Sequence, residues 1–267
     1  MKSSLTRSER AVEPSAVVTT APSGDPAEAQ QLARRFGLRA VPREGRTVEQ
    51  VLRDGGGSPV LVLGSCRADL YERGRVYRAT VGMAFLRVLR ARRGEIDPIV
   101  AYANLQPGDA VLDATLGLGG DALVAAHATG AKVVGLEADA VIAAFTQASL
   151  RRLPKHGREP GRLVDVIRAD HRTWLQQQPE GSFDVVLLDP MFRRSGDAGP
   201  LFDLLRGRAD HAPLDAETLR HARRVARRGV LVKDAARGEE LQRLGLRPRP
   251  TRRSAAIAFG WVPAFHP

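Results

Sequence analysis

The 267-residue chain has a single cysteine, Cys66, which excludes an intramolecular disulfide. No apolar run approaches the roughly 18 residues of a membrane-spanning helix, and the first residues lack the apolar core of a signal peptide. Aromatic residues make up only 5% of the chain, yet 43% of it is hydrophobic, which is enough to bury a sizeable core. We therefore expect a cytoplasmic globular protein.

Two kinds of catalytic site are also missing from the sequence. Histidine and cysteine do not occur together at the spacing of metal ligands, and no Ser-His-Asp arrangement is suggested. Cys66 is interpreted as a small packing residue rather than a nucleophile. The sequence thus predicts no resident metal and no serine-hydrolase chemistry.

Positive charge, by contrast, is plentiful. Lysine and arginine number 41 against 30 acidic residues, a net charge of +11, and nearly all the cations are arginine. Either a compositional bias of the coding genome or a polyanionic partner would explain this excess. Because phosphate contacts supply most non-specific nucleic-acid affinity, we expect an RNA partner. The basic residues group at 87–93, 220–228 and 247–253.

Three regions follow one another along the chain. Residues 1–14 are polar, without any period, and are expected to form a disordered leader. Residues 15–75 read as a small α/β module, and residues 76–267 as the main domain. Within the module we predict strands at Val17–Thr20, Pro59–Leu63 and Ala68–Glu72, and helices at Ala27–Phe36 and Val48–Leu52.

The main domain opens with a predicted helix over Tyr77–Arg93, which has one apolar and one basic face. That basic face would either follow a phosphate backbone or simply be solvated. A short helix at Ile99–Asn104 leads into alternating strands and helices. The predicted strands are Ala110–Asp113, Lys132–Glu137, Leu163–Arg168, Phe183–Leu188 and Gly229–Lys233. The helices are Ala122–Ala128, Ala140–Leu153, His171–Gln177 and Ala216–Ala226.

This alternation, with nearly continuous apolar strands, predicts an α/β fold with a doubly wound, mostly parallel sheet. Ser254–Val262 is expected to add an antiparallel edge strand. In such sheets ligands bind outside the carboxyl ends of the strands.

A glycine-rich turn follows the first of these strands. Gly117, Gly119 and Gly120 lead into the next helix, and a turn without Cβ atoms lets the backbone approach a ligand closely. Any α/β protein can have such a turn, so this feature alone is weak. Asp113 lies just before it, and Glu137 lies 20 positions after Gly117, where a carboxylate meets ribose hydroxyls.

Acidic residues close four consecutive strands: Asp113, Glu137, Asp170 and Asp189. Carboxylates suit a cationic nucleoside cofactor without pyrophosphate, so S-adenosylmethionine fits better than NAD. Asp170 is placed to bond the adenine amino group. The predicted cofactor-binding residues are Asp113, Thr115, Gly117, Gly119, Gly120, Asp121, Glu137, Ala138, Ala169, Asp170 and Asp189.

The candidate catalytic motif is Asp189-Pro-Met-Phe192, directly after the fourth strand. The Asp189 carboxylate and the Pro190 carbonyl are suited to accept hydrogen bonds from an exocyclic amine and to orient its lone pair. Phe192 would stack on the base, or instead pack into the core as part of a turn. We expect Arg87, Phe192 and Lys233 to contact substrate. Lys233 would hold a phosphate, or be only a solvated strand end.

Together these motifs resemble the ribosomal RNA small subunit methyltransferase J family, class I (Rossmann-like) enzymes that use S-adenosylmethionine. The resemblance runs from about Val76 to Lys233. The matching stretches are Gly82-Met-Ala84 with Arg87, Asp113–Ala122, Leu136-Glu137, Leu188–Phe192 and Val230–Lys233.

The resemblance implies that Gly120 and Asp121, Glu137 and Ala138, Ala169 and Asp170, and Asp189 contact cofactor. It further implies methylation of a guanine N2 in 16S ribosomal RNA, with rRNA or the small subunit as partner. The chain departs from the family at Gly120, where many relatives have arginine, and at Asp170-His171, where some have small hydroxyl residues.

Other functions remain open on sequence grounds. The chain could methylate a protein or a small molecule, or bind RNA without turnover. An NAD-dependent oxidoreductase would have to bind pyrophosphate beside Asp113 and Asp121, which would repel it.

Overall fold

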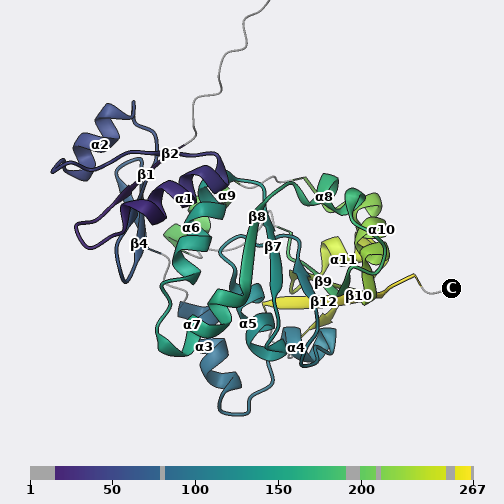
Figure 1. The fold of residues 1–267 in the computed structure, drawn as a ribbon. Helices are drawn as coiled ribbons and strands as arrows, with labels where there is room; N and C mark the ends of the chain where they lie inside the picture. The colour runs from purple at the N-terminus through teal and green to yellow at the C-terminus, as the bar shows by residue number, and fades with distance from the viewer. Residues whose placement is uncertain (1–15, 79–81, 191–198, 209–211, 251–255, 266–267) are drawn as a thin grey trace, which may run out of the picture.

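The computed structural model describes residues 16–78, 82–190, 199–208, 212–250 and 256–265. Two β-sheets organise these residues, one from positions 17–78 and the other from positions 111–263 (Figure 1). No helix within the described ranges is long and apolar enough to cross a membrane.

The first sheet has five strands in the order β2-β1-β3-β4-β5. Its strands are β1 (Val17–Thr20), β2 (Arg39–Ala40), β3 (Val60–Leu63), β4 (Ala68–Glu72) and β5 (Arg75–Arg78), with helices α1 (Pro26–Phe36) and α2 (Val48–Asp54). The strands β1, β2 and β3 are parallel, and β4 and β5 add an antiparallel hairpin.

The first helix shows how local sequence sets its ends. Asp25 accepts a hydrogen bond from the Ala27 amide, and Pro26 occupies the first turn, where no backbone donor is needed. Gly37, at φ 69°, closes the helix in the left-handed region. The predicted strands and helices of this module are all confirmed, whereas the short strands β2 and β5 were not predicted.

The second sheet has seven strands in the order β11-β12-β10-β9-β6-β7-β8. Its parallel strands are β6 (Val111–Asp113), β7 (Val133–Glu137), β8 (Val164–Arg168), β9 (Phe183–Leu188) and β10 (Ala226–Ala235). The antiparallel strands are β12 (Ile257–Pro263) and β11 (Arg249–Pro250). The strand order reverses between β6 and β9, which is where ligands bind in open α/β sheets.

Helices cover both faces of this sheet. They are α3 (Gly82–Ala91), α4 (Pro98–Ala103), α5 (Gly120–Thr129), α6 (Ala140–Leu150), α7 (Lys155–Leu163), α8 (His171–Gln177), α9 (Pro200–Arg206), α10 (Ala216–Val225) and α11 (Glu239–Arg243). Successive residues of β6 show the two faces: Val111 belongs to one apolar cluster and Leu112 to the other. The predicted α/β class with a mostly parallel sheet is confirmed.

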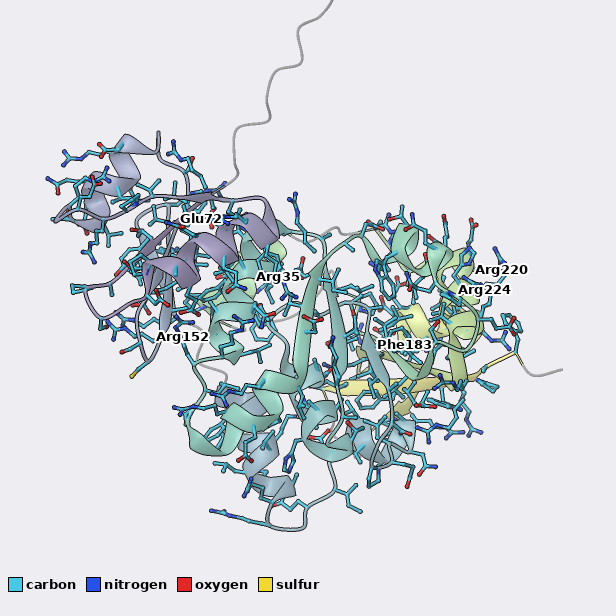
Figure 2. The ribbon with its side chains drawn as sticks, in the orientation of Figure 1. Arg35, Glu72, Arg152, Phe183, Arg220 and Arg224 are labelled. Atoms are coloured by element: carbon cyan, nitrogen blue, oxygen red, sulfur yellow. The ribbon has the colours of Figure 1, made fainter. Side chains whose placement is uncertain are left out.

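Ion pairs between the module and the large sheet hold the two together. Arg152, only 6% exposed, bonds both carboxylate oxygens of Glu28 in α1 at 2.9 and 2.6 Å, and its Nε donates to the Gly64 carbonyl. Arg35 of α1 pairs with Asp165 of β8 at 2.5 Å. Figure 2 shows Arg35 and Arg152 at this junction, where α1 packs on α6.

The bounds of two helices were predicted wrongly, and several elements were not predicted. Tyr77 belongs to strand β5 rather than to the helix, and α3 begins at Gly82. The helix after β7 ends at Leu150, and a separate α7 follows. Helix α9 was not predicted, and the antiparallel β12 has a further strand, β11, outside it. The division at residue 76 stays a prediction; the first sheet itself extends to Arg78.

Candidate active site at the carboxyl ends of the central strands

A cavity of about 330 Å³ opens at the carboxyl ends of β6, β7, β8 and β9. This volume is within the range of small-molecule sites. Residues within 202–208 and 212–218, from α9 to α10, form another wall. The cavity therefore lies at the point where the strand order reverses.

The glycine-rich turn forms one side of the cavity. Gly117 and Gly119 have φ of 52° and 73°, and α5 starts at Gly120, so two backbone positions need glycine. Gly117 and Gly120 line the cavity. Gly119 is not among the lining residues: a Cβ there would lie 3.2 Å from a Thr146 methyl carbon, so this glycine serves the packing of the turn on α6.

Glu137, at the end of β7, is fixed in place by the backbone. One carboxylate oxygen accepts the Asp139 amide at 2.9 Å, and the other accepts the Gly117 amide at 3.2 Å. Burial raises the pKa of Glu137 above its ordinary value. The first glycine of the turn and the acidic residue of the next strand are thus held together, as their 20-residue spacing predicts.

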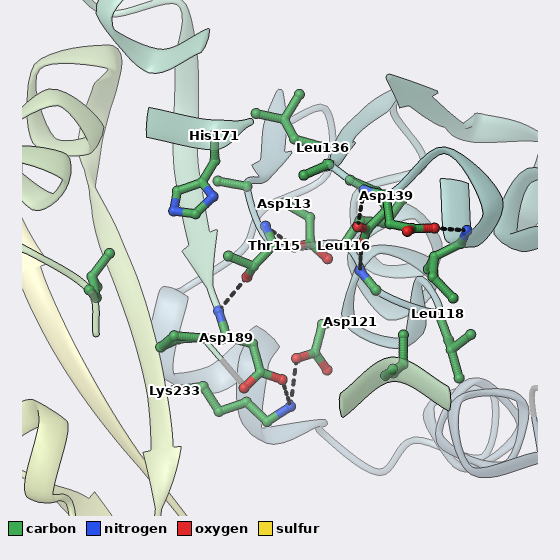
Figure 3. Close-up of a pocket in the computed structure, with 18 of the residues that line it drawn as sticks. Asp113, Thr115, Leu116, Leu118, Asp121, Leu136, Asp139, His171, Asp189 and Lys233 are labelled. Atoms are coloured by element: carbon green, nitrogen blue, oxygen red, sulfur yellow. Dashed lines mark hydrogen bonds and ion pairs between the residues drawn. The ribbon is translucent and has the colours of Figure 1, made fainter. Parts of the chain in front are cut away.

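Asp113 and Asp189 are connected through Thr115. The Thr115 amide donates to Asp113 at 3.2 Å, and the Thr115 hydroxyl accepts the Asp189 amide at 2.6 Å (Figure 3). Asp113 is 3% exposed, and burial together with the nearby Asp121 raises its pKa to about 8. Without a cationic ligand, Asp113 is therefore largely protonated at neutral pH.

A chain of alternating charges crosses the floor of the cavity. Lys233 bonds Asp189 at 2.5 Å and Asp121 at 2.9 Å (Figure 3), and Arg87 bonds Asp121 at 2.5 Å. The other end of Arg87 holds both oxygens of Asp97 at 2.8 Å. The order is Asp97, Arg87, Asp121, Lys233, Asp189, so each cation lies between two carboxylates.

These pairs set the protonation of the acids. Burial alone would raise the pKa of Asp121, but Lys233 and Arg87 outweigh it and hold that pKa at about 2. For Asp189 burial outweighs the pull of Lys233, and its pKa stays above the ordinary value. The pKa of Lys233 is raised by Asp189 and Asp121 against its own burial. Asp121 is thus ionised throughout the neutral pH range, while the carboxyl group of Asp189 is more easily protonated than an ordinary aspartate.

Most of the predicted site residues share this cavity. Its lining includes Arg87, Asp113, Thr115, Gly117, Gly120, Asp121, Glu137, Ala138, Ala169, Asp170, Asp189, Pro190 and Lys233. Phe192 lies outside the described residues. Lys233 is not a solvated strand end, because its side chain is 18% exposed and pairs with two acids. Arg87 does not share the exposed face of Arg90, Arg92 and Arg93 but points at Asp121.

Sequence reasoning missed several lining residues. Asp139 and Arg208 bond each other, and His171, interpreted as structural, also lines the cavity. Phe202 and Leu205 come from α9, which the sequence did not reveal. The Gly199-Pro200 start of α9, a proline in the first helical turn, is the signal that would have indicated this helix.

Comparison with known proteins identifies the family of this chain. A family model described as "Putative SAM-dependent methyltransferase" matches residues 58–250. The chain belongs to this family. The cofactor of the methyltransferase is S-adenosylmethionine.

Two relatives and one solved structure are similar to this chain. The methyltransferase is 30% identical over 245 residues to "Uncharacterized protein YpiP" of Bacillus subtilis (strain 168), covering 88% of this chain and 93% of that protein. It is 44% identical over 88 residues to ribosomal RNA small subunit methyltransferase J of Laribacter hongkongensis (strain HLHK9), about a third of each chain. A SAM-dependent methyltransferase from Neisseria gonorrhoeae has the same fold, with a TM-score of 0.63 and 22% identity, over 93% of this chain and 96% of that one.

The residues present fit S-adenosylmethionine. When bound, this cofactor supplies an electrophilic methyl group on a positively charged sulfonium. The methyltransferase offers carboxylates of Asp113, Glu137, Asp170 and Asp189 around one cavity, which suits a ligand with two cationic centres. Gly117 leaves that wall open, since a Cβ there would meet nothing closer than Leu205 at 3.8 Å.

Proposed function

We propose that this methyltransferase acts on RNA, at the exocyclic N2 of a guanine in 16S ribosomal RNA. The observation that carries the proposal is the position of Asp189. Its carboxylate, followed by the Pro190 carbonyl, lines the same cavity as Glu137 and is held by Lys233 at 2.5 Å. A carboxylate beside a proline carbonyl provides two acceptors for the two hydrogens of a planar amine.

The same arrangement supports a set of cofactor contacts. Glu137 would bond the ribose hydroxyls, and Asp170 would accept the adenine amino group. The methionine portion would lie near Gly117 and Asp113. Asp113 would be ionised when the ammonium group of the cofactor is beside it, because an adjacent cation lowers the pKa of a buried acid.

Asp189 would both orient the acceptor amine and take its proton. The bound cofactor would supply the methyl group: the nitrogen lone pair would form the new N–C bond, and the electron pair of the broken S–C bond would stay on sulfur. The N–H proton then passes to the Asp189 carboxylate. A pKa raised by burial makes Asp189 a better proton acceptor than an exposed aspartate, while Lys233 keeps it ionised beforehand.

Phe202 provides an aromatic face at the cavity mouth. It lies on α9, lines the cavity, and is 47% exposed. An exposed ring that lines the same cavity as the Asp189 carboxylate suits stacking with a base. This supports a nucleobase rather than an aliphatic amine as acceptor.

Charge and relatives support RNA as the partner. The net charge is +11, and Arg90, Arg92 and Arg93 are exposed beyond the cavity. The arginines at 220–228 contribute less than their number indicates. Arg224 bonds backbone carbonyls at 175, 176 and 178, and Arg227 and Arg228 pair with acids. Three relatives that match 32%, 49% and 54% of this chain are named as ribosomal RNA small subunit methyltransferase J.

The test is methyl transfer from labelled S-adenosylmethionine to unmodified 16S ribosomal RNA and to small ribosomal subunits, followed by nucleoside analysis. We expect label in N2-methylguanosine. Asp189→Asn should lose this label, whereas Asp184→Asn, on β9 and outside the cavity, should not. Label only in protein, or in a ring-carbon or ribose methyl product, would contradict the proposal. Binding of S-adenosylhomocysteine without any transfer would favour a non-catalytic RNA-binding role.

A further inference from the structure

Arg208, just after α9, bonds an acid on each side. Its guanidinium donates to Asp139 at 3.0 Å and to Glu72 at 2.8 Å. Arg208 also lines the cofactor cavity, and its side chain is 16% exposed, while Glu72 and Asp139 are 13% and 24% exposed. The three side chains come from three separate parts of the chain, and all are mostly shielded from water.

Asp139 connects Arg208 to the proposed ribose-binding acid. Its amide donates to Glu137, and its carboxylate caps α6 by accepting the amides of Val141 and Ile142 at 2.9 Å. A shift of Asp139 would therefore move the amide that fixes Glu137. Arg208 thus acts on the cavity through one intervening residue.

Glu72 connects Arg208 to the N-terminal module. It is the last residue of β4, in the five-stranded sheet, and Figure 2 shows it among the side chains of that module. Helix α9 also contacts β5 of the same sheet. In addition, Leu205 of α9 approaches Gly117, the glycine of the cofactor turn. Helix α9 is therefore packed between the module and the cavity.

The electrostatics favour a single arrangement of these groups. Glu72 and Asp139 are two mostly buried acids that share one cation, so without Arg208 they would repel each other and, among the described residues, would have no ion-pair partner. Removing one partner of a buried charge network is costly because the remaining charges stay desolvated. Arg208 therefore holds the end of α9 at one place.

We propose that Arg208 and Glu72 are positioning residues through which the N-terminal module holds α9 against the cavity, so that the module contributes to cofactor affinity. Neither residue contacts the reacting atoms. Glu72, at the end of β4, is therefore one of the two acids that fix Arg208 and, with it, the end of α9. This role is independent of which nucleotide, or which class of substrate, is methylated.

The test measures S-adenosylhomocysteine binding by calorimetry with the full chain. Arg208→Ala should weaken binding about 10-fold or more, and Glu72→Gln about 5-fold, as for coupled charge networks. Arg208→Lys should recover part of the loss. The matched control is Asp69→Asn on the same strand, since Asp69 pairs with Arg67 and Arg78 and not with α9. The affinity of Asp69→Asn for S-adenosylhomocysteine should lie within about twofold of the wild-type affinity, because Asp69 is not coupled to α9 through Arg208.

The double variant decides between coupling and mere destabilisation. Arg208→Ala with Glu72→Gln should bind no more weakly than Arg208→Ala alone, because both substitutions remove the same contact. Hydrogen exchange of residues 200–208 should rise in Glu72→Gln but not in Asp69→Asn. If Glu72→Gln binds like the wild type, or if the two losses multiply, the proposal is overturned. A loss in Asp69→Asn equal to that in Glu72→Gln would also overturn it.

Discussion

The ammonium nitrogen of Lys233 lies 2.5 Å from a carboxylate oxygen of Asp189, 44 positions earlier in the chain. The parallel pairing of β9 and β10 brings them together, since Leu188, just before Asp189, is the register partner of Val232, just before Lys233. The second contact of Lys233, to Asp121, attaches this pair to the first turn of α5. The acid proposed to accept the amine proton is therefore held from two elements.

Replacing Lys233 should change the pH dependence of transfer. Lys233 lowers the pKa of Asp189, which burial raises, so Lys233→Met should raise that pKa further. Because the ionised form accepts the proton, the acidic limb of the rate profile should move to higher pH. We expect about 10- to 100-fold slower transfer at pH 7. Lys233→Arg should restore the limb toward its original position. An unmoved limb in Lys233→Met would exclude this role.

Asp113 should make the fold less stable as pH rises. Its folded pKa of about 8 exceeds its ordinary value of 3.8, so between these pH values the folded state binds the extra proton. The free energy of unfolding should fall relative to Asp113→Asn by about 1.4 kcal/mol per pH unit in this window. Below pH 3.8 the difference in the free energy of unfolding between the wild type and Asp113→Asn should not change with pH. Urea unfolding at pH 4, 6 and 8 measures it, and parallel curves for the two proteins would contradict the pKa shift.

Glu137 should contribute to cofactor affinity. Glu137→Ala removes the proposed bonds to the ribose and also the acceptor for the Gly117 amide. The loss of charge-assisted bonds corresponds to about 1.5–3 kcal/mol, or roughly 10- to 150-fold in the dissociation constant of S-adenosylhomocysteine. Glu180→Gln, an exposed acid outside the cavity, serves as the control. Equal affinity in Glu137→Ala and the wild type would remove Glu137 from the site.

Phe202 should act on substrate rather than on cofactor. If its exposed ring stacks on a base, Phe202→Ala should raise the KM for RNA by an amount equivalent to about 1–3 kcal/mol. The dissociation constant of S-adenosylhomocysteine should change little. Phe202→Trp keeps a ring face and should retain most activity. A variant that loses cofactor binding but keeps its KM for RNA would show that Phe202 only closes the cavity.

RNA affinity should depend steeply on salt, and the exposed arginines at and just after the end of α3 should account for part of the dependence. If about five phosphates are neutralised on single-stranded RNA, the slope of log affinity against log salt should be near −3.5. Substituting Arg90, Arg92 and Arg93 by glutamine should reduce the slope by about 2. A flat dependence in the wild type would favour a protein or small-molecule substrate.

The sequence predicted the alternating strands and the acids at their ends because parallel strands carry unbroken apolar runs. The ends of β9 and α8 fall where they were predicted. Helix α7 was missed because it contains Gly157, Pro160 and Gly161, which have poor helix propensity. Tertiary packing against α5 and α3 stabilises it instead.

Long-range pairing could not be read from the sequence. Tyr77 fits a helical period, but its backbone pairs with Leu70 in an antiparallel hairpin. In the sequence, the arginines near 224 look like a free basic patch. Figure 2 labels Arg220 and Arg224 on α10. The Arg224 guanidinium, however, donates its hydrogen bonds to backbone carbonyls. Helix α9 starts from a glycine and a proline, and only its contacts with the module and the cavity show what it does.

The most direct test of the account separates binding from chemistry at Asp189. S-adenosylhomocysteine affinity and the rate of methyl transfer to 16S ribosomal RNA are measured on the wild type, Asp189→Ala and Asp184→Asn. We expect Asp189→Ala to bind the ligand within about tenfold of the wild type and to transfer methyl about 100- to 1000-fold more slowly. Asp184→Asn should match the wild type in both measurements. Full transfer by Asp189→Ala would contradict the account.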